Sequence, residues 1–296
     1  MKKIIAIVFI LLFSATVVLA DEVEDTLAGL ANEPVMTATR QMIQKGIEKD
    51  DAIEMTKLML QNQFSLQQTL QAQQMLMQAV QSGLPAEPLM NKAKEGMAKK
   101  IQSGSVLQAM EQVQSRYAFT YRKAEQLTED PEEVSELGDL MADALTAGFQ
   151  KGDIEPIMER LMTRTMERQK VDDELATETC MTLRDMARLG VSSDAITDVV
   201  SEALSQNYTA SEMEALRESF MYAAKKGEPE KTANSYATQM RQGESPESPG
   251  SSGAGGTGPS GETGGTGSDG AGSNGSGSGG GGANGDGPGG PGGAHK

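Results

Sequence analysis

Histidine and cysteine are almost absent from this chain of 296 residues. Its one histidine, His295, lies next to the C-terminus, and its one cysteine is Cys180. A lone cysteine cannot form an intramolecular disulfide. Without a histidine in the body of the chain, neither a Ser-His-Asp triad nor a histidine-ligated zinc centre can be assembled there. We therefore expect no catalytic, metal-binding or cofactor-binding residues and no enzyme activity, and paired-carboxylate chemistry is the class that composition leaves open.

Tryptophan is also absent, and tyrosine and phenylalanine number only 5 and 6. Strand signals are missing from residues 22–242, which contain no alternating β-branched runs and no Asn-Gly turns. These residues are instead rich in Ala, Leu, Met, Gln, Glu and Lys, which favour helices. The sequence predicts an all-α fold of roughly nine to ten helices.

Basic residues are outnumbered, with 26 Lys and Arg against 42 Asp and Glu, which gives a formal net charge of −16. Such a charge argues against nucleic acid or an anionic membrane as a partner. It fits simple solubility, attraction to a basic protein, or loose binding of divalent cations at the surface. The partners expected are therefore proteins of the cell envelope.

Long apolar runs are lacking except at the N-terminus. In residues 1–20, two lysines precede an apolar stretch that ends in Val18 and Ala20. These two residues occupy the small-residue positions that a signal peptidase recognises. We interpret this segment as a cleaved signal peptide of bacterial type. An uncleaved membrane anchor is the alternative, and the expected location is the periplasm or the extracellular space.

Residues 243–296 form a second distinct segment, in which glycine and serine dominate. A chain of this composition cannot bury enough apolar surface to offset the entropy lost on ordering. We predict a disordered tail, which would serve either as a tether or as a neutral, solubilising appendage.

Between these segments a short pattern recurs, with a glycine followed directly by an apolar residue. Glycine just past a helix end can adopt the left-handed conformation that closes the last turn, and the next apolar residue packs back onto that turn. We therefore predict structural helix stops at Gly46, Gly83, Gly148 and Gly190, which precede Ile47, Leu84, Phe149 and Val191.

Each helix stop predicts a tight corner between two helices. The spacing between successive stops leaves room for two helices, or for three between Gly83 and Gly148. Residues 21–242 are thus expected to form an irregular array of helical hairpins or two packed helical bundles, with a sub-boundary near 128–131.

Capping patterns support several helix starts. The segments that begin at Thr209 and Ser105 carry Glu212 and Gln108 three positions later, as in a capping box. Asp130 precedes a proline, which predicts a helix that begins with a capping aspartate and Pro at its first position.

Methionine is abundant, with 19 copies. Met75, Met77, Met90 and Met97 lie close to a glutamine-rich stretch, residues 61–74. Flexible thioethers can line a groove that accepts varied apolar segments, so these methionines are candidate partner-binding residues. The alternative for the glutamines is an uncharged, solvated helix face.

A second methionine row, Met158, Met162 and Met166, lies along one helix face. Thioethers can bind Cu(I), but the same face carries Ile154 and Leu161, which favours a core role. Phe119 points away from the core face of its helix, so it needs a second neighbour, either another helix or a partner protein.

Together these patterns favour an exported, non-enzymatic helical-repeat protein that binds or scaffolds other proteins of the bacterial envelope. A carboxylate-dependent envelope enzyme acting on glycan is the first alternative. A chaperone-like holder of apolar segments, which would use a methionine-rich surface, is the second.

Overall fold

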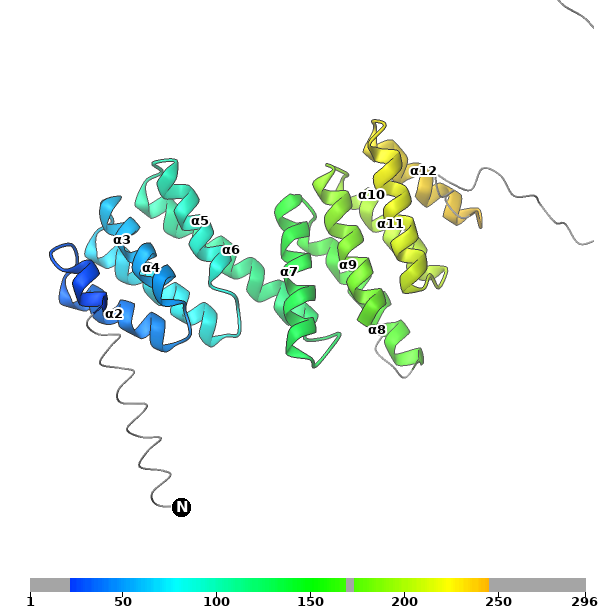
Figure 1. Ribbon diagram of the computed structural model, residues 1–296. Coiled ribbons are helices and arrows are strands. Elements are labelled where there is room, and N and C mark those ends of the chain that lie inside the picture. The colour runs from blue at the N-terminus through cyan, green and yellow to red at the C-terminus, as the bar shows by residue number, and fades with distance from the viewer. Residues whose placement is uncertain (1–21, 169–172, 245–296) are drawn as a thin grey trace, which may run out of the picture. The chain divides into compact units, whose positions relative to one another are not determined.

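The computed structural model describes residues 22–168 and 173–244 (Figure 1). Throughout these ranges the regular structure is helical and includes no strand, which confirms the all-α prediction. The predicted signal peptide, residues 1–20, lies outside the described residues. So does the predicted tail, residues 243–296, apart from its first two residues.

The helices are mostly short and follow one another closely. Their bounds are α2 (Glu33–Gln44), α3 (Lys49–Gln61), α4 (Leu66–Gln81), α5 (Glu87–Ala98), α6 (Ser103–Ala124), α7 (Pro131–Ala147), α8 (Lys151–Arg168), α9 (Asp173–Arg188), α10 (Ser193–Ser205), α11 (Ala210–Ala224) and α12 (Pro229–Arg241).

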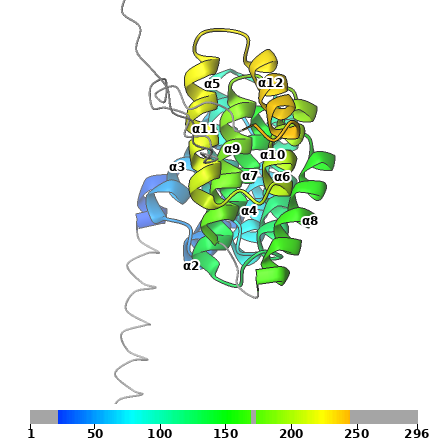
Figure 2. The same ribbon diagram turned by 90° about the vertical axis from the view of Figure 1, so that its right-hand side faces the viewer.

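Six helices form one row, and the other helices flank it in two separate groups. In this first row, α2, α4, α6, α7, α9 and α11 each lie against the next. In one flanking group α3 lies against α5, and in the other α10 lies between α8 and α12. Figure 2 looks along the first row, with α9 and α11 on one side and α8 and α12 on the other. The chain therefore alternates between the first row and a flanking group as stacked hairpins, except that α6 and α7 follow each other within the first row.

Each of the four glycines predicted as helix stops lies at a helix end with a positive φ angle, between 72° and 120°. The amide of the apolar residue after each glycine donates a hydrogen bond back to a carbonyl in the last helical turn; the distance from Leu84 N to Ala79 O is 2.9 Å. The apolar residues themselves are buried, with 3% to 7% of their surface exposed. This is the Schellman arrangement, in which one left-handed residue satisfies the free carbonyls of a helix end.

Three further corners use the same geometry without glycine. Gln63, Lys100 and Asn207 have φ angles of 60°, 56° and 62°, and the residue after each donates the same backward backbone bond. Gly46 and Gly83 are 37 residues apart, as are Gln63 and Lys100. In the first half of the chain the structural repeat is therefore a hairpin of 37 residues with two corners, of which the glycine pattern revealed only one.

Helix starts agree with the sequence in two cases of three. At α11, Thr209 and Glu212 form a complete capping box, and Asp130 accepts hydrogen bonds from the first amides of α7. The box predicted at Ser105 is wrong, because the N-cap of α6 is Gln102, three residues earlier, and the helix begins at Ser103. A box that the sequence analysis missed, between Ser65 and Gln68, starts α4.

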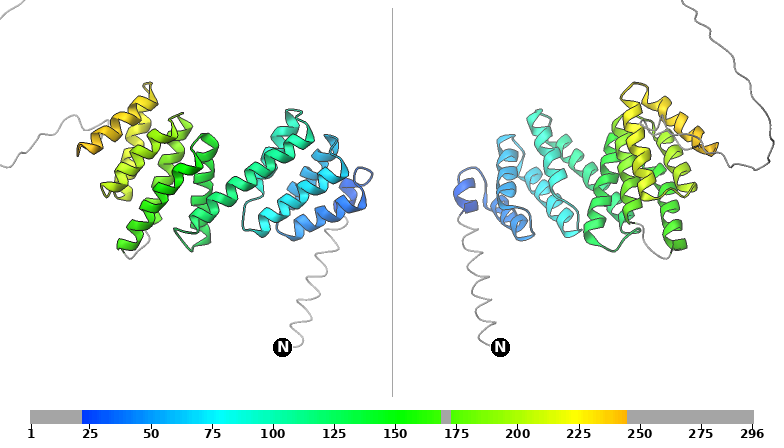
Figure 3. Two further views of the ribbon diagram at one scale, coloured as in Figure 1. Left: turned by 180° about the vertical axis from the view of Figure 1, so that it is seen from behind. Right: turned by 45° about the vertical axis from the view of Figure 1, so that its right-hand side comes forward.

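Two apolar cores meet at the α6–α7 pair, which Figure 3 shows between the earlier and later helices. Tyr121 belongs to the first core, and Ala124, one turn later on α6, belongs to the second. Gly138 of α7 lies directly against the Tyr121 ring, where a Cβ atom would come within 2.4 Å of ring carbon Cδ2. The Tyr121 hydroxyl donates to Asp139 Oδ1 at 2.9 Å. The loop at 128–131 therefore joins α6 and α7, the two helices that together form the boundary between the cores.

We expect Lys100→Gly to raise the free energy of unfolding by about 0.5 to 1 kcal/mol, because glycine adopts the left-handed conformation without a steric cost. Gly83→Ala should lower it by about 1 kcal/mol. A Cβ atom at Gly83 would meet nothing within 4 Å. The expected loss of stability therefore comes from the strained backbone conformation alone. Urea denaturation of both variants measures the two effects, and shifts in the same direction would contradict the assigned corner geometry.

Gly138→Ala should lower the free energy of unfolding by about 1 to 3 kcal/mol, because the added methyl group overpacks the contact with Tyr121. The matched control is Gly104→Ala in α6, where the methyl group meets nothing within 4 Å. That change should be neutral or stabilise by about 0.5 kcal/mol. Thermal unfolding of the two variants gives the comparison, and equal losses would argue against a close α6–α7 approach.

Candidate functional site

Three of the methionines predicted to bind a partner are core residues. Met75, Met90 and Met97 are 8%, 4% and 4% exposed and belong to the first core. Met77 is partly buried against the same core. Their thioethers fill the space between neighbouring helices, as methionine often does. Burial therefore removes Met75, Met90 and Met97 from any binding surface and corrects that expectation.

The methionine row on α8 is also directed largely inward. Met158 is 2% exposed, and Met162 packs partly buried against the second core; the side chain of Met166 lies outside the described residues. Within residues 22–168 and 173–244, no group of three or more His, Cys, Asp or Glu side chains is placed to hold a metal ion.

Phe119 has its second neighbour within the same chain. Its ring packs partly buried against the second core. Lys151, from the start of α8, holds its Nζ 5.2 Å from the ring centroid, and Lys123 holds its Nζ at 5.9 Å. These are cation–π distances, so a helix of this protein occupies the position for which a partner protein was the alternative.

Cys180 is 1% exposed within the second core. Burial, assisted by the charge of Glu136, raises the pKa of its thiol from 9.0 to about 12. A thiol with so high a pKa is a poor nucleophile at neutral pH. Its position assigns Cys180 a packing role.

The surface with the most concentrated chemistry is a cleft of about 480 Å³ between α7, α9 and α11. Six carboxylates line it, together with Thr177, Ala210 and Ser211. We call this surface the acidic cleft, and its carboxylates are Glu133, Glu136, Asp173, Glu174, Glu178 and Glu214.

The origin of the acidic cleft can be traced to its helix starts. All its lining residues come from the N-terminal halves of three neighbouring first-row helices, so α7, α9 and α11 present the same end to the cleft. Acidic residues are favoured in a first helical turn because they are attracted to the positive end of the helix dipole, which accounts for Glu133, Asp173 and Glu174. The other three carboxylates lie in the second turns. Stacking the three helices side by side therefore gathers carboxylates that are far apart in sequence.

The carboxylates of the cleft differ in how far they are neutralised. Glu178 pairs with Arg217 at 2.9 Å, and Glu133 accepts a hydrogen bond from the Thr128 hydroxyl at 2.5 Å. Glu136, Glu174 and Glu214 are exposed and form no ion pair with any residue that the structure describes. The acidic cleft thus carries uncompensated negative charge that faces solvent.

A second cavity, of about 520 Å³, lies between α8 and α10 and contains Arg160 and Arg164. Arg164 is only 6% exposed, and its Nη1 donates to the backbone oxygen of Tyr208 at 2.7 Å. That bond ties α8 to the corner after α10. We therefore assign Arg164 a structural role at this corner.

The sequence analysis did not predict the acidic cleft. The signal was present as Glu133 after Asp130, as Glu174 after Asp173, and as Glu214 near the start of α11. Only the order of helices within the first row shows that these three starts are neighbours.

None of the helices in the described ranges combines the length and the apolar character needed to cross a membrane. No family model, curated protein or solved structure matches this chain. Function is therefore inferred from its residues and their geometry.

The burial of Cys180 predicts its reactivity. At pH 8 the folded chain should react with a thiol reagent such as Ellman's reagent roughly 1,000-fold more slowly than the chain unfolded in urea, since a pKa near 12 in place of 9.0 lowers the thiolate fraction by that factor. Stopped-flow absorbance measures both rates. A fast reaction in the folded state would place Cys180 at the surface.

Proposed function

We propose that this protein is an exported, non-enzymatic helical-repeat protein of the bacterial envelope that binds a partner protein through its acidic cleft. The observation that supports this proposal is the convergence of six carboxylates from the N-terminal halves of three helices on one cavity. Export is proposed from the signal-like residues 1–20. The matching partner surface is a basic segment that presents lysine or arginine side chains.

Electrostatics favours this kind of partner. A concave surface lined by one sign of charge concentrates its field and raises the local concentration of oppositely charged ligands. Glu136, Glu174 and Glu214 have no cation of their own among the described residues, so they can pair with an incoming one. Three such pairs at about 0.5 to 1 kcal/mol each supply about 2 kcal/mol, and the affinity falls as salt screens them.

The second candidate, a carboxylate-dependent enzyme acting on glycan, is favoured by the same cleft, because acid–base hydrolysis of a glycosidic bond needs two nearby carboxylates. The chaperone-like holder loses most of its predicted methionine surface, because Met75, Met90 and Met97 are buried.

Binding to an arginine-rich peptide tests the proposal. We expect the mature chain, residues 21–296, to bind a fluorescent octa-arginine peptide at low salt. The triple change Glu136→Gln, Glu174→Gln and Glu214→Gln should weaken that binding at least tenfold, because it removes three unpaired charges and leaves the shape of the cleft almost unchanged. Fluorescence anisotropy at several salt concentrations measures the affinity.

The matched control is the triple change Glu48→Gln, Glu111→Gln and Glu125→Gln, which alters the net charge equally at exposed positions outside the cleft. It should weaken binding by less than about twofold. Equal losses in the two variants would contradict a cleft-specific site and leave only general charge attraction. Glycan cleavage that the cleft variant abolishes and the control retains would establish the enzyme instead.

A further inference from the structure

One helix of the array carries no charge. Among α2 to α12, only α4 contains no Asp, Glu, Lys or Arg, and the uncharged run extends from Leu58 to Ala86. The whole chain has 23% charged residues. A charge-free run of this length on an exposed helix therefore calls for an explanation beyond solubility.

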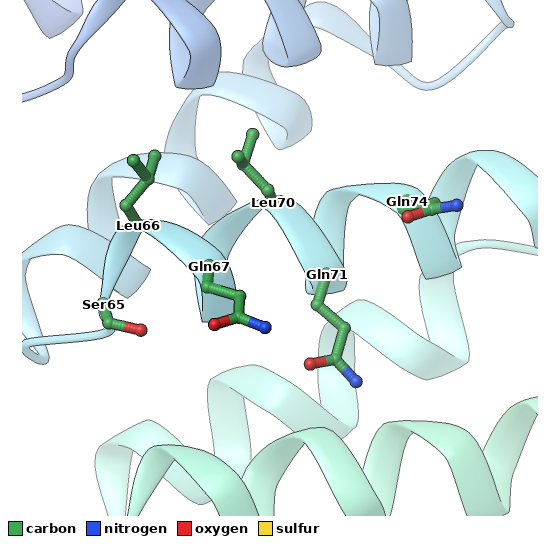
Figure 4. Close-up of a pocket in the computed structure, with 6 residues that line it drawn as sticks. All are labelled: Ser65, Leu66, Gln67, Leu70, Gln71 and Gln74. Carbon is green, nitrogen blue, oxygen red and sulfur yellow. The ribbon is translucent and has the colours of Figure 1, made fainter.

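The outer side of α4 lines an open surface pocket of about 650 Å³ (Figure 4). Its lining, which we call the glutamine face, consists of Ser65, Leu66, Gln67, Leu70, Gln71 and Gln74. Figure 4 shows Leu66 and Leu70 on one side of the helix and Gln67 and Gln71 on the other. Leu66 is 45% exposed, which makes it one of the few large apolar side chains on the described surface.

The glutamine face is not required by the core. The one glutamine that the core uses, Gln73, is fully buried on the opposite side of α4 and donates to Thr39 Oγ1 and Thr56 Oγ1 at 2.9 and 3.0 Å. The other side of the helix contributes no such contacts. Its leucines and amides are therefore available to another molecule.

We propose that the glutamine face is the contact between two copies of this chain. A contact with two-fold symmetry places the same patch against itself, so the patch must be self-complementary. A glutamine amide meets that condition because it both donates and accepts hydrogen bonds, whereas a carboxylate facing its own copy is repelled. Leucines facing their own copy bury apolar surface.

The charge of the chain favours an uncharged contact. Two copies, each with a net charge of −16, repel one another. At physiological salt the repulsion is screened beyond about 8 Å, so the local charge at the contact decides whether it forms. The glutamine face brings no charge of its own to such a contact. In the proposed dimer the two-fold axis lies near Leu70, midway between Leu66 and Gln74 along the helix.

The contact is small. A single helix face buries less than the roughly 1,200 Å² typical of a stable interface. The dimer is therefore weak, with a dissociation constant on the order of 10 to 100 µM. Because screening weakens the repulsion between the acidic copies, the dimer becomes tighter as salt increases.

Sedimentation equilibrium of residues 21–296 tests the proposal over a concentration range around that dissociation constant. We expect a monomer–dimer equilibrium, which the double change Gln71→Glu and Gln74→Glu weakens at least tenfold at 0.15 M salt and less at 0.5 M salt. The matched control, Gln126→Glu with Gln242→Glu, makes the same charge change at exposed positions outside α4 and should weaken it less than twofold. Far-ultraviolet circular dichroism checks that each variant is folded.

A covalent trap provides a second measurement. Leu70→Cys should form a disulfide-linked dimer on mild oxidation, because the two-fold axis brings the two sulfur atoms together, whereas Gln126→Cys should not. A purely monomeric chain that gives no Leu70→Cys crosslink would overturn the proposal. So would a dimer that the α4 variant leaves unchanged, because its contact would then lie elsewhere. The acidic-cleft variant should leave the dimer intact, so this result is independent of peptide binding.

Discussion

The backbone hydrogen bond that closes each helix at its corner is the interaction on which the rest of the structure depends. In the glycine corners it joins the amide of the apolar residue after the glycine to a carbonyl in the last turn, as between Leu84 N and Ala79 O at 2.9 Å. The bond requires a left-handed residue before the amide. It reverses the chain within a few residues, so that each short helix is laid against another. Helices of 12 or 13 residues, such as α2 and α3, are marginal alone and gain their stability from this packing.

Regular corners also decide which helix ends become neighbours. Because α7, α9 and α11 are separated by one helix each along the chain and lie side by side in the first row, their N-terminal halves line the same cleft. The helix dipole is a local reason for the acidic first turns of α7 and α9. Stacking of the hairpins adds carboxylates from the second turns to form the acidic cleft, while the uncharged α4 lies elsewhere in the same row. The two proposed surfaces differ in charge and are suited to different partners.

The accuracy of sequence reasoning varied with the chemistry of each position. Glycine corners such as Gly190 were visible because few other residues favour a left-handed conformation. The corners at Lys100 and Asn207 were missed because only glycine was taken as a signal, whereas other residues, asparagine among them, can also adopt that conformation. Thr209 was placed correctly as a cap, but Ser105 was not, because α6 begins one turn earlier than its serine pattern suggests. Met90 was misassigned because methionine serves cores and binding surfaces equally well.

By itself, the sequence determined the helical class, the positions of the glycine corners and the lack of histidine chemistry in the body of the chain, since these follow from residue type and local spacing. The tertiary structure alone determined which helices line a common cleft. It also placed Phe119 beside Lys151, and Gly138 directly against the ring of Tyr121. Those outcomes depend on contacts between residues far apart along the chain. Local propensity carries no information about such contacts, and packing establishes them only when all the hairpins are stacked.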